Sequence, residues 1–216
     1  MKKTQTFLKP ALVLTASLML FSCVSEIESP IVQEDVKLLE TINSDSNGDE
    51  NLRKSAERNY FERFTNQLFS LDDDGNPTSE IPAYFPGTGV GNSTHMGKSL
   101  TFINQFVQFG PNGLETVAAP VTKFFEKELT SLGITNIPDE VSSITTDRKG
   151  NSVWFKAISN TVSLTPESPI ANFVAKVEII GGTGKFENAT GYGEVIGSFN
   201  QVSGEGSSVI KGRIEY

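Results

Sequence analysis

Hydrophobic and polar residues alternate along several short segments of the chain from about residue 60 onward. Phe173, Ala175, Val177 and Ile179 fall on alternate positions, and most residues between them are polar. The last segment, 206–216, alternates in the same way. Successive side chains of a strand point to opposite faces, so this period of two puts one face on a core and the other in water. The pattern predicts antiparallel strands with one buried face.

Turn-forming residues separate eight such segments, and together they predict an all-β domain. The predicted strands are Tyr60–Ser70, Gly97–Phe109, Leu114–Ala118, Val141–Thr146, Ser152–Ser163, Ile170–Ile180, Tyr192–Gln201 and Gly206–Tyr216. Short connections favour a single eight-stranded antiparallel, lipocalin-like up-and-down barrel, because closure leaves no open sheet edge.

Two segments interrupt this strand pattern. Apolar residues recur at helical spacing between Pro120 and Leu132, with a proline at the start and Gly133 at the end, which predicts one short helix inserted between strands. The span Asp72–Asn92 is rich in proline, glycine and asparagine and is predicted to be a long surface loop.

The N-terminus has the features of a bacterial lipoprotein signal. Lysines precede an apolar run from Ala11 to Phe21, and Leu-Phe-Ser-Cys ends the run at Cys23 in the form of a lipobox. About 11 apolar residues are too few for a membrane-spanning helix, which needs about 20. The pattern predicts a cleaved signal peptide over residues 1–22 and lipidation of Cys23. The alternative is an ordinary signal peptide with a chance cysteine near its end.

Composition divides the rest of the chain into two parts. Residues 23–58 are poor in aromatics and rich in Ser, Asn, Asp and Glu, which is typical of a flexible acidic tether. Residues 59–216 form the predicted barrel domain. Val24-Ser25-Glu26 after the cysteine carries no clear inner-membrane retention signal. We therefore expect a lipid-anchored protein of the bacterial cell envelope, at the outer membrane.

Charge and cysteine content exclude some classes of function. The net charge of −8 becomes −11 when residues 1–22, with three lysines and no acidic residue, are removed. An acidic protein is disfavoured as a partner of nucleic acid, which is a polyanion. With the only cysteine lipidated and a single histidine, the sequence predicts no disulfide, no metal centre and no cofactor.

One glycine-rich motif lies before the last two predicted strands. It reads GTGKF from Gly182, followed by ATG from Ala189. Gly182 and Gly184 can adopt positive φ in a tight connection. The residues Phe186 and Ala189 can fold back as a plug. The structural motif therefore comprises Gly182, Thr183, Gly184, Phe186, Ala189 and Gly191, with Gly191 allowing the next strand to bend.

This motif resembles the turn of the allene oxide cyclase and dirigent-like β-barrels, whose bacterial relatives carry GTGRF-x-x-ATG before a final pair of strands. Two weaker similarities to exported members of that group lie at residues 91–98 and 145–155. Together the three segments cover roughly a quarter of the chain. The resemblance implies a small lipocalin-like barrel. It assigns no cyclase activity and no catalytic residue.

His95 is the one candidate for a barrel-mouth residue, because it precedes a predicted strand beside a glycine-rich loop. Its other interpretation is a ring hydrogen bond to a backbone carbonyl that fixes the start of the strand. An enzyme would also need a polar group inside an apolar pocket. Only four further residues are loosely placed for that role, and all are expected to face solvent: Glu126, Glu178, Glu187 and Glu194.

Three functions remain open at this point. The first is a lipid-anchored barrel that binds a small apolar or amphipathic ligand, since eight strands enclose space for one small molecule. The second is a non-catalytic structural or interaction module whose barrel is filled with side chains. The third is a cyclase or isomerase-like enzyme, which the sequence favours least.

Overall fold

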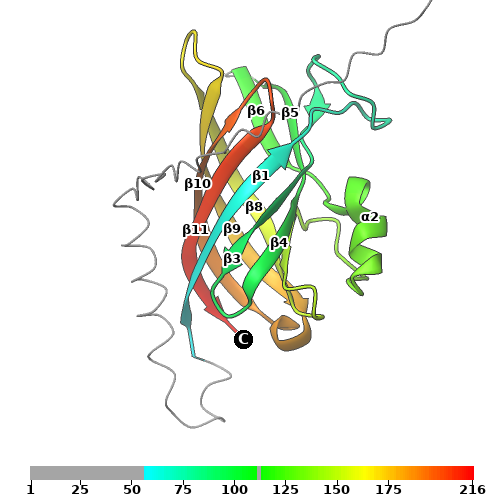
Figure 1. Ribbon diagram of the computed structural model, residues 1–216, viewed down its shortest axis with the longest axis vertical. Helices are drawn as coiled ribbons and strands as arrows, with labels where there is room; N and C mark the ends of the chain where they lie inside the picture. The colour runs from blue at the N-terminus through cyan, green and yellow to red at the C-terminus, as the bar shows by residue number, and fades with distance from the viewer. Residues whose placement is uncertain (1–55, 111–112) are drawn as a thin grey trace, which may run out of the picture.

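The computed structural model describes residues 56–110 and 113–216. The predicted signal peptide, Cys23 and the tether up to residue 55 lie outside the described residues. Within the described part, the chain forms one closed β-barrel with a helix against its outer surface (Figure 1). No helix of this part is long and apolar enough to span a membrane.

Eight antiparallel strands close the barrel, and each pairs with the next barrel strand along the chain. They are β1 (Arg58–Leu68), β3 (Gly87–Ser93), β4 (Gly97–Ile103), β7 (Ser143–Thr146), β8 (Ser152–Leu164), β9 (Ile170–Thr183), β10 (Thr190–Asn200) and β11 (Glu205–Glu215). Pairing of β11 with β1 completes the closure. The predicted class, an eight-stranded antiparallel up-and-down barrel with one short helix, is confirmed.

Strand β3 lies almost wholly inside the span predicted to be a loop, so the prediction for Asp72–Asn92 was wrong over residues 87–92. Gly87, Gly89 and Gly91 occupy alternate positions of this strand. A Cβ atom on Gly89 would lie 2.2 Å from the Asn66 Oδ1 atom, so the interior leaves no room for a side chain there. These glycines indicate close approach between neighbouring strands and not a turn.

A second difference concerns the segment Gly97–Phe109, which was predicted to be one strand. The chain leaves the barrel at Asn104, whose backbone N–H donates to the Ser142 carbonyl and whose side-chain amide donates to the Pro120 carbonyl, both at 2.8 Å. Beyond it, a separate three-stranded sheet forms from β2 (Ala83–Tyr84), β5 (Gln105–Gly110) and β6 (Gly113–Ala118). The predicted strand Leu114–Ala118 therefore belongs to this sheet and not to the barrel.

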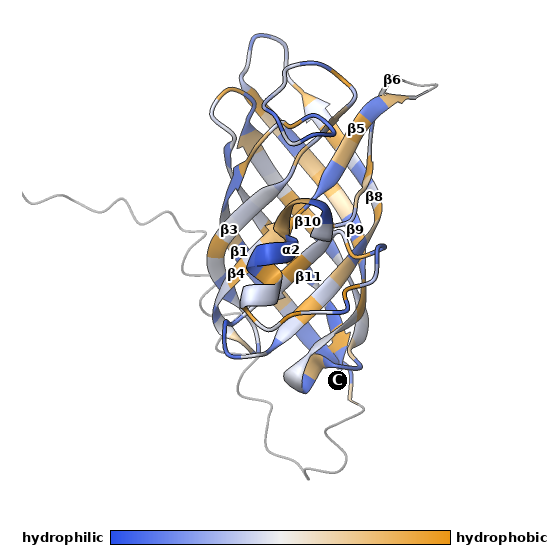
Figure 2. Cartoon of the chain, turned by 90° about the vertical axis from the view of Figure 1, so that its right-hand side faces the viewer, coloured by the Kyte–Doolittle hydropathy of each residue, from blue (hydrophilic) through white to orange (hydrophobic). Residues whose placement is uncertain are grey.

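Helix α2 (Thr122–Ser131) lies within the predicted helical span and packs on the outside of the barrel (Figure 2). Its Leu129 is fully buried, and the Phe125 ring lies 5.3 Å from the ring of Phe102 on β4. Gly133, at φ +75°, ends the helix as predicted. This contact forms a second apolar core outside the barrel, over β4 and β7.

The main core fills one end of the barrel, which we call the closed end. A short 3-10 helix, η2 (Gly184–Phe186), turns the chain inward there between β9 and β10. Phe186 and Ala189 are buried in that core, as the plug interpretation expected. Gly184 has φ +61° as predicted, whereas Gly182 does not have a positive φ. Gly182 is needed for space, because a Cβ there would lie 2.0 Å from the Ser152 carbonyl oxygen.

Candidate functional site

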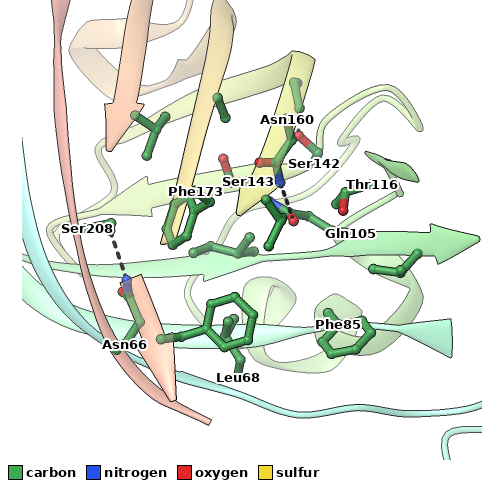
Figure 3. A pocket seen from close by; sticks show the side chains of 18 of the residues that line it. Asn66, Leu68, Phe85, Gln105, Thr116, Ser142, Ser143, Asn160, Phe173 and Ser208 are labelled. Atoms are coloured by element: carbon green, nitrogen blue, oxygen red, sulfur yellow. Dashed lines mark hydrogen bonds between the residues drawn. The ribbon is translucent and has the colours of Figure 1, made fainter. Parts of the chain in front are cut away.

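A cavity of about 500 Å³ occupies the barrel above the closed end and opens at the opposite end, the mouth. Strands β8 to β11 form its apolar wall, and the side formed by β1, β4 and β7, where polar side chains lie among Phe64, Leu68 and Ile103, is called the polar wall. The apolar wall includes Phe173, Ala175, Val177, Val195, Phe199 and Ile210. The polar wall includes Glu62, Asn66, Thr101, Ser142 and Thr145. Figure 3 shows side chains from both walls converging on the same space.

The most unusual side chain of this cavity is Glu62, which lies toward the closed end and is only 1% exposed. The Tyr60 hydroxyl donates a hydrogen bond to its Oε1 atom, and the Thr145 hydroxyl donates to its Oε2 atom at 3.1 Å. Burial raises the pKa of Glu62 from 4.5 to about 7, against the opposing effect of these two hydrogen bonds. A carboxyl group with such a pKa exchanges a proton near neutral pH.

Tyr60 forms the layer below Glu62 and belongs to the core of the closed end. Burial, together with the neighbouring Glu62 carboxyl, raises the pKa of Tyr60 well above its ordinary value of 10. The tyrosine therefore remains protonated and serves as the hydrogen-bond donor to Glu62. The pair places one acidic group, held by two hydroxyl donors, at the floor of an otherwise uncharged cavity.

Two amide side chains add polar atoms to the cavity walls (Figure 3). The Asn66 Nδ2 atom donates to the Ser208 hydroxyl at 2.9 Å, and the Asn160 Nδ2 atom donates to Gln105 Oε1 at 2.8 Å. The amide oxygens of both asparagines are buried and have no hydrogen-bond partner in the described part of the chain. Such unsatisfied groups are uncommon and costly in proteins.

The mouth is extended on one side by the three-stranded sheet. Gln105 and Val107 of β5 and Thr116 of β6 line the cavity there, and the Asn160 hydrogen bond ties β5 to β8. Exposed apolar side chains lie in or beside the connections at the same end: Phe69, Leu164, Ile170 and Val202. The route from solvent into the cavity is therefore lined by a mixture of apolar and uncharged polar groups.

His95 lies at the closed end and not at the mouth where the prediction placed it. Its Nε2 atom is 3.0 Å from the Asn59 carbonyl oxygen, and its ring packs edge-on against Tyr216 at 5.5 Å. The histidine does not line the cavity. Its location follows from β3, because this additional strand before His95 reverses the direction of the chain and brings the residue to the other end.

The other predicted site residues also lie away from the cavity. The motif residues Gly182, Thr183, Gly184, Phe186, Ala189 and Gly191 build the closed end and do not line the cavity. The side chains of Glu126, Glu178, Glu187 and Glu194 are exposed. Within residues 56–110 and 113–216, no cluster of three or more His, Cys, Asp or Glu side chains could hold a metal ion.

Sequence analysis did not single out Glu62, although the signal was present. Tyr60, Glu62, Phe64, Asn66 and Leu68 occupy alternate positions of one predicted strand and therefore share one face. Tyr60 and Phe64 mark that face as the inner one. The same argument also places Asn66 inside the barrel.

These observations define a class of protein: a small, closed, eight-stranded antiparallel barrel with an open, largely apolar interior cavity and one buried carboxyl group. Comparison with known proteins does not narrow this class to a particular family. No protein-family model, no curated protein and no solved structure matches this chain.

Proposed function

We propose that this protein is a lipid-anchored component of the bacterial cell envelope, at the outer membrane, whose barrel binds a small apolar or amphipathic molecule. The observation that carries the binding proposal is the cavity of about 500 Å³. Its size lies within the usual range of about 300 to 1,000 Å³ for ligand sites, and its mainly apolar lining with a few polar groups is typical of them. A barrel filled with side chains would have no such space.

We also propose kinship with the allene oxide cyclase and dirigent-like barrels. The support is the GTGKF and ATG motif, which in this chain forms a connection between two adjacent strands of an eight-stranded barrel. The proposal concerns architecture, and no catalytic residue is transferred with it.

An enzyme of the cyclase or isomerase type is the second candidate, because one specific observation favours it. Glu62 is a buried carboxyl in a mainly apolar cavity, and its pKa is raised to about 7. Such a group is suited to accept or donate a proton at neutral pH. Isomerisation or cyclisation of a bound molecule that is lost in Glu62→Gln would identify the protein as this kind of enzyme.

The binding proposal is tested by filling the cavity with Ala175→Phe. Ala175 lines the apolar wall, and a phenyl ring there occupies part of the space that a ligand would fill. Loss of buried surface equivalent to about three methylene groups, at about 0.8 kcal/mol each, lowers affinity about fiftyfold. The measurement is titration of the chain from Val24 onward, which contains every described residue, with the uncharged fluorescent dye N-phenyl-1-naphthylamine.

The matched control for this experiment is Val174→Phe. Val174 is the preceding residue of β9 and is 46% exposed on the outer face of the barrel. This variant is expected to bind the dye as the unchanged protein does. Equal affinities for all three proteins would show that the dye binds outside the cavity, and would contradict the proposal.

The anchor is tested with Cys23→Ser in the full chain. Only a thiol can form the thioether to diacylglycerol, so incorporation of radiolabelled palmitate is expected to fall to background. Cleavage before residue 23 should stop as well, leaving a precursor about 22 residues longer. Unchanged palmitate labelling of the serine variant would contradict lipidation at this residue.

A further inference from the structure

The cavity lining formed by the described residues contains an acidic side chain but no basic one. Among the residues that line it in the described part of the chain, Glu62 is the only one with a charged side chain, and no lysine, arginine or histidine is present. The groups in contact with its carboxyl are hydroxyls, from Tyr60 on β1 and Thr145 on β7. An anionic head group inside the barrel would therefore face a carboxyl without any compensating cation.

The connections at the mouth also carry acidic residues, so their charge has the same sign as that of Glu62. The connections between β1 and β2, β8 and β9, and β10 and β11 lie at this end; the first two contain acidic residues, and none of the three contains a lysine or arginine. Their acidic residues are Asp72, Asp73, Asp74, Glu80 and Glu167. One of them is paired with a cation from outside these connections, since Lys123 of α2 lies 2.9 Å from the Asp73 carboxylate.

Several cations of the described residues lie at the closed end instead. The connection between β7 and β8 contains Arg148 and Lys149, and the one between β9 and β10 contains Lys185. Arg58, at the start of β1, lies there too, over the Tyr216 ring. A ligand entering at the mouth therefore passes acidic residues before it reaches Glu62, and acidic groups favour cations over anions.

We propose that the cavity selects amphiphiles by charge: it takes molecules whose polar end is a neutral hydroxyl or a cationic amine, and it excludes those that end in a carboxylate or another anion. This inference rests on the proposed binding function. Burying a carboxylate without a cation or enough hydrogen-bond donors is strongly unfavourable, whereas an ammonium group can pair with Glu62.

The experiment compares three probes that share a 12-carbon chain: 1-dodecanol, dodecylamine and dodecanoate. Each displaces N-phenyl-1-naphthylamine from the chain that begins at Val24, at pH 8 and below its micellar concentration. Dodecanoate is expected to bind at least about tenfold more weakly than dodecanol, and dodecylamine at least as tightly as dodecanol.

Two further measurements separate the interior charge from the charges at the mouth. Glu62→Gln is expected to tighten dodecanoate and weaken dodecylamine, each by about fivefold. Glu194→Gln makes the same change on the outer face and should preserve the original order. Salt at 1 M screens exposed charges much more than buried ones, so the effect of Glu62 should persist in it.

The possible outcomes distinguish this inference from the function on which it rests. If the dye binds and the three probes displace it equally, or dodecanoate does so most strongly, selection by charge is overturned while a binding cavity remains. If neither the dye nor any probe binds, the proposed function itself fails. Weak dodecanoate binding that is relieved by Glu62→Gln supports both.

Discussion

The protein is expected to lose about 3 kcal/mol of stability, relative to its Glu62→Gln variant, between pH 4.5 and pH 8.5. The pKa of Glu62 is about 7 in the folded protein and returns to about 4.5 on unfolding. The folded state therefore binds more protons between these values, and stability falls as the pH rises. A difference of about 2.5 between the pKa values of Glu62 in the folded and unfolded protein corresponds to about 3 kcal/mol.

The stabilising contribution is complete below pH 4.5 and is lost as the pH rises through 7. Glutamine keeps the shape of the protonated carboxyl and does not ionise, so the variant should lack this decline. Urea unfolding, followed by the fluorescence of the single tryptophan, Trp154, measures the difference at each pH. The matched control Glu194→Gln leaves the interior carboxyl in place and should retain the decline. Parallel pH profiles for the unchanged protein and Glu62→Gln would refute a buried ionising carboxyl.

Loss of the plug at the closed end is expected to have an effect of similar size. Phe186 is completely buried, and its ring lies 4.6 Å from the ring of Tyr216 within the main core. Phe186→Ala removes a large buried side chain and leaves a void, a change that typically costs about 3 to 5 kcal/mol. The free energy of unfolding in urea should fall by about that amount.

The neighbouring residue provides the control for this variant. Glu187 follows in the same connection, but its side chain is exposed. Glu187→Ala is therefore expected to change the free energy of unfolding by no more than about 0.5 kcal/mol. Equal losses in the two variants would mean that the connection itself, and not the burial of the phenyl ring, stabilises the closed end.

The fold class could be predicted because its signals are local. Segments such as 170–180 and 206–216 alternate with a period of two, and a strand expresses that period directly in its own sequence. The helix near residue 125 was found for the same reason, since its apolar spacing and Gly133 lie within a few residues of each other. The inward turn of Phe186 and Ala189 also follows from a short motif.

Strand β3 was missed because it is rich in glycine, a residue that is usually depleted in strands and common in loops. Gly87, Gly89 and Gly91 were interpreted as loop residues, although they occupy successive positions on one face of a strand. Only the tertiary contacts, with Asn66 on β1 and Thr101 on β4, show why a side chain is excluded at Gly89. The same error placed His95 at the wrong end, because a missing strand reverses the direction of the chain.

The sequence by itself determined an all-β barrel with one inserted helix, the motif that plugs one end, and the prediction of a lipidated Cys23. Only the tertiary structure decided which strands close the barrel, that its interior contains a cavity, and that Glu62 lies within it beside Tyr60 and Thr145. The physical reason is that strand pattern is a property of neighbouring residues. Interior space and a shifted pKa depend instead on what strands far apart in the chain bring together.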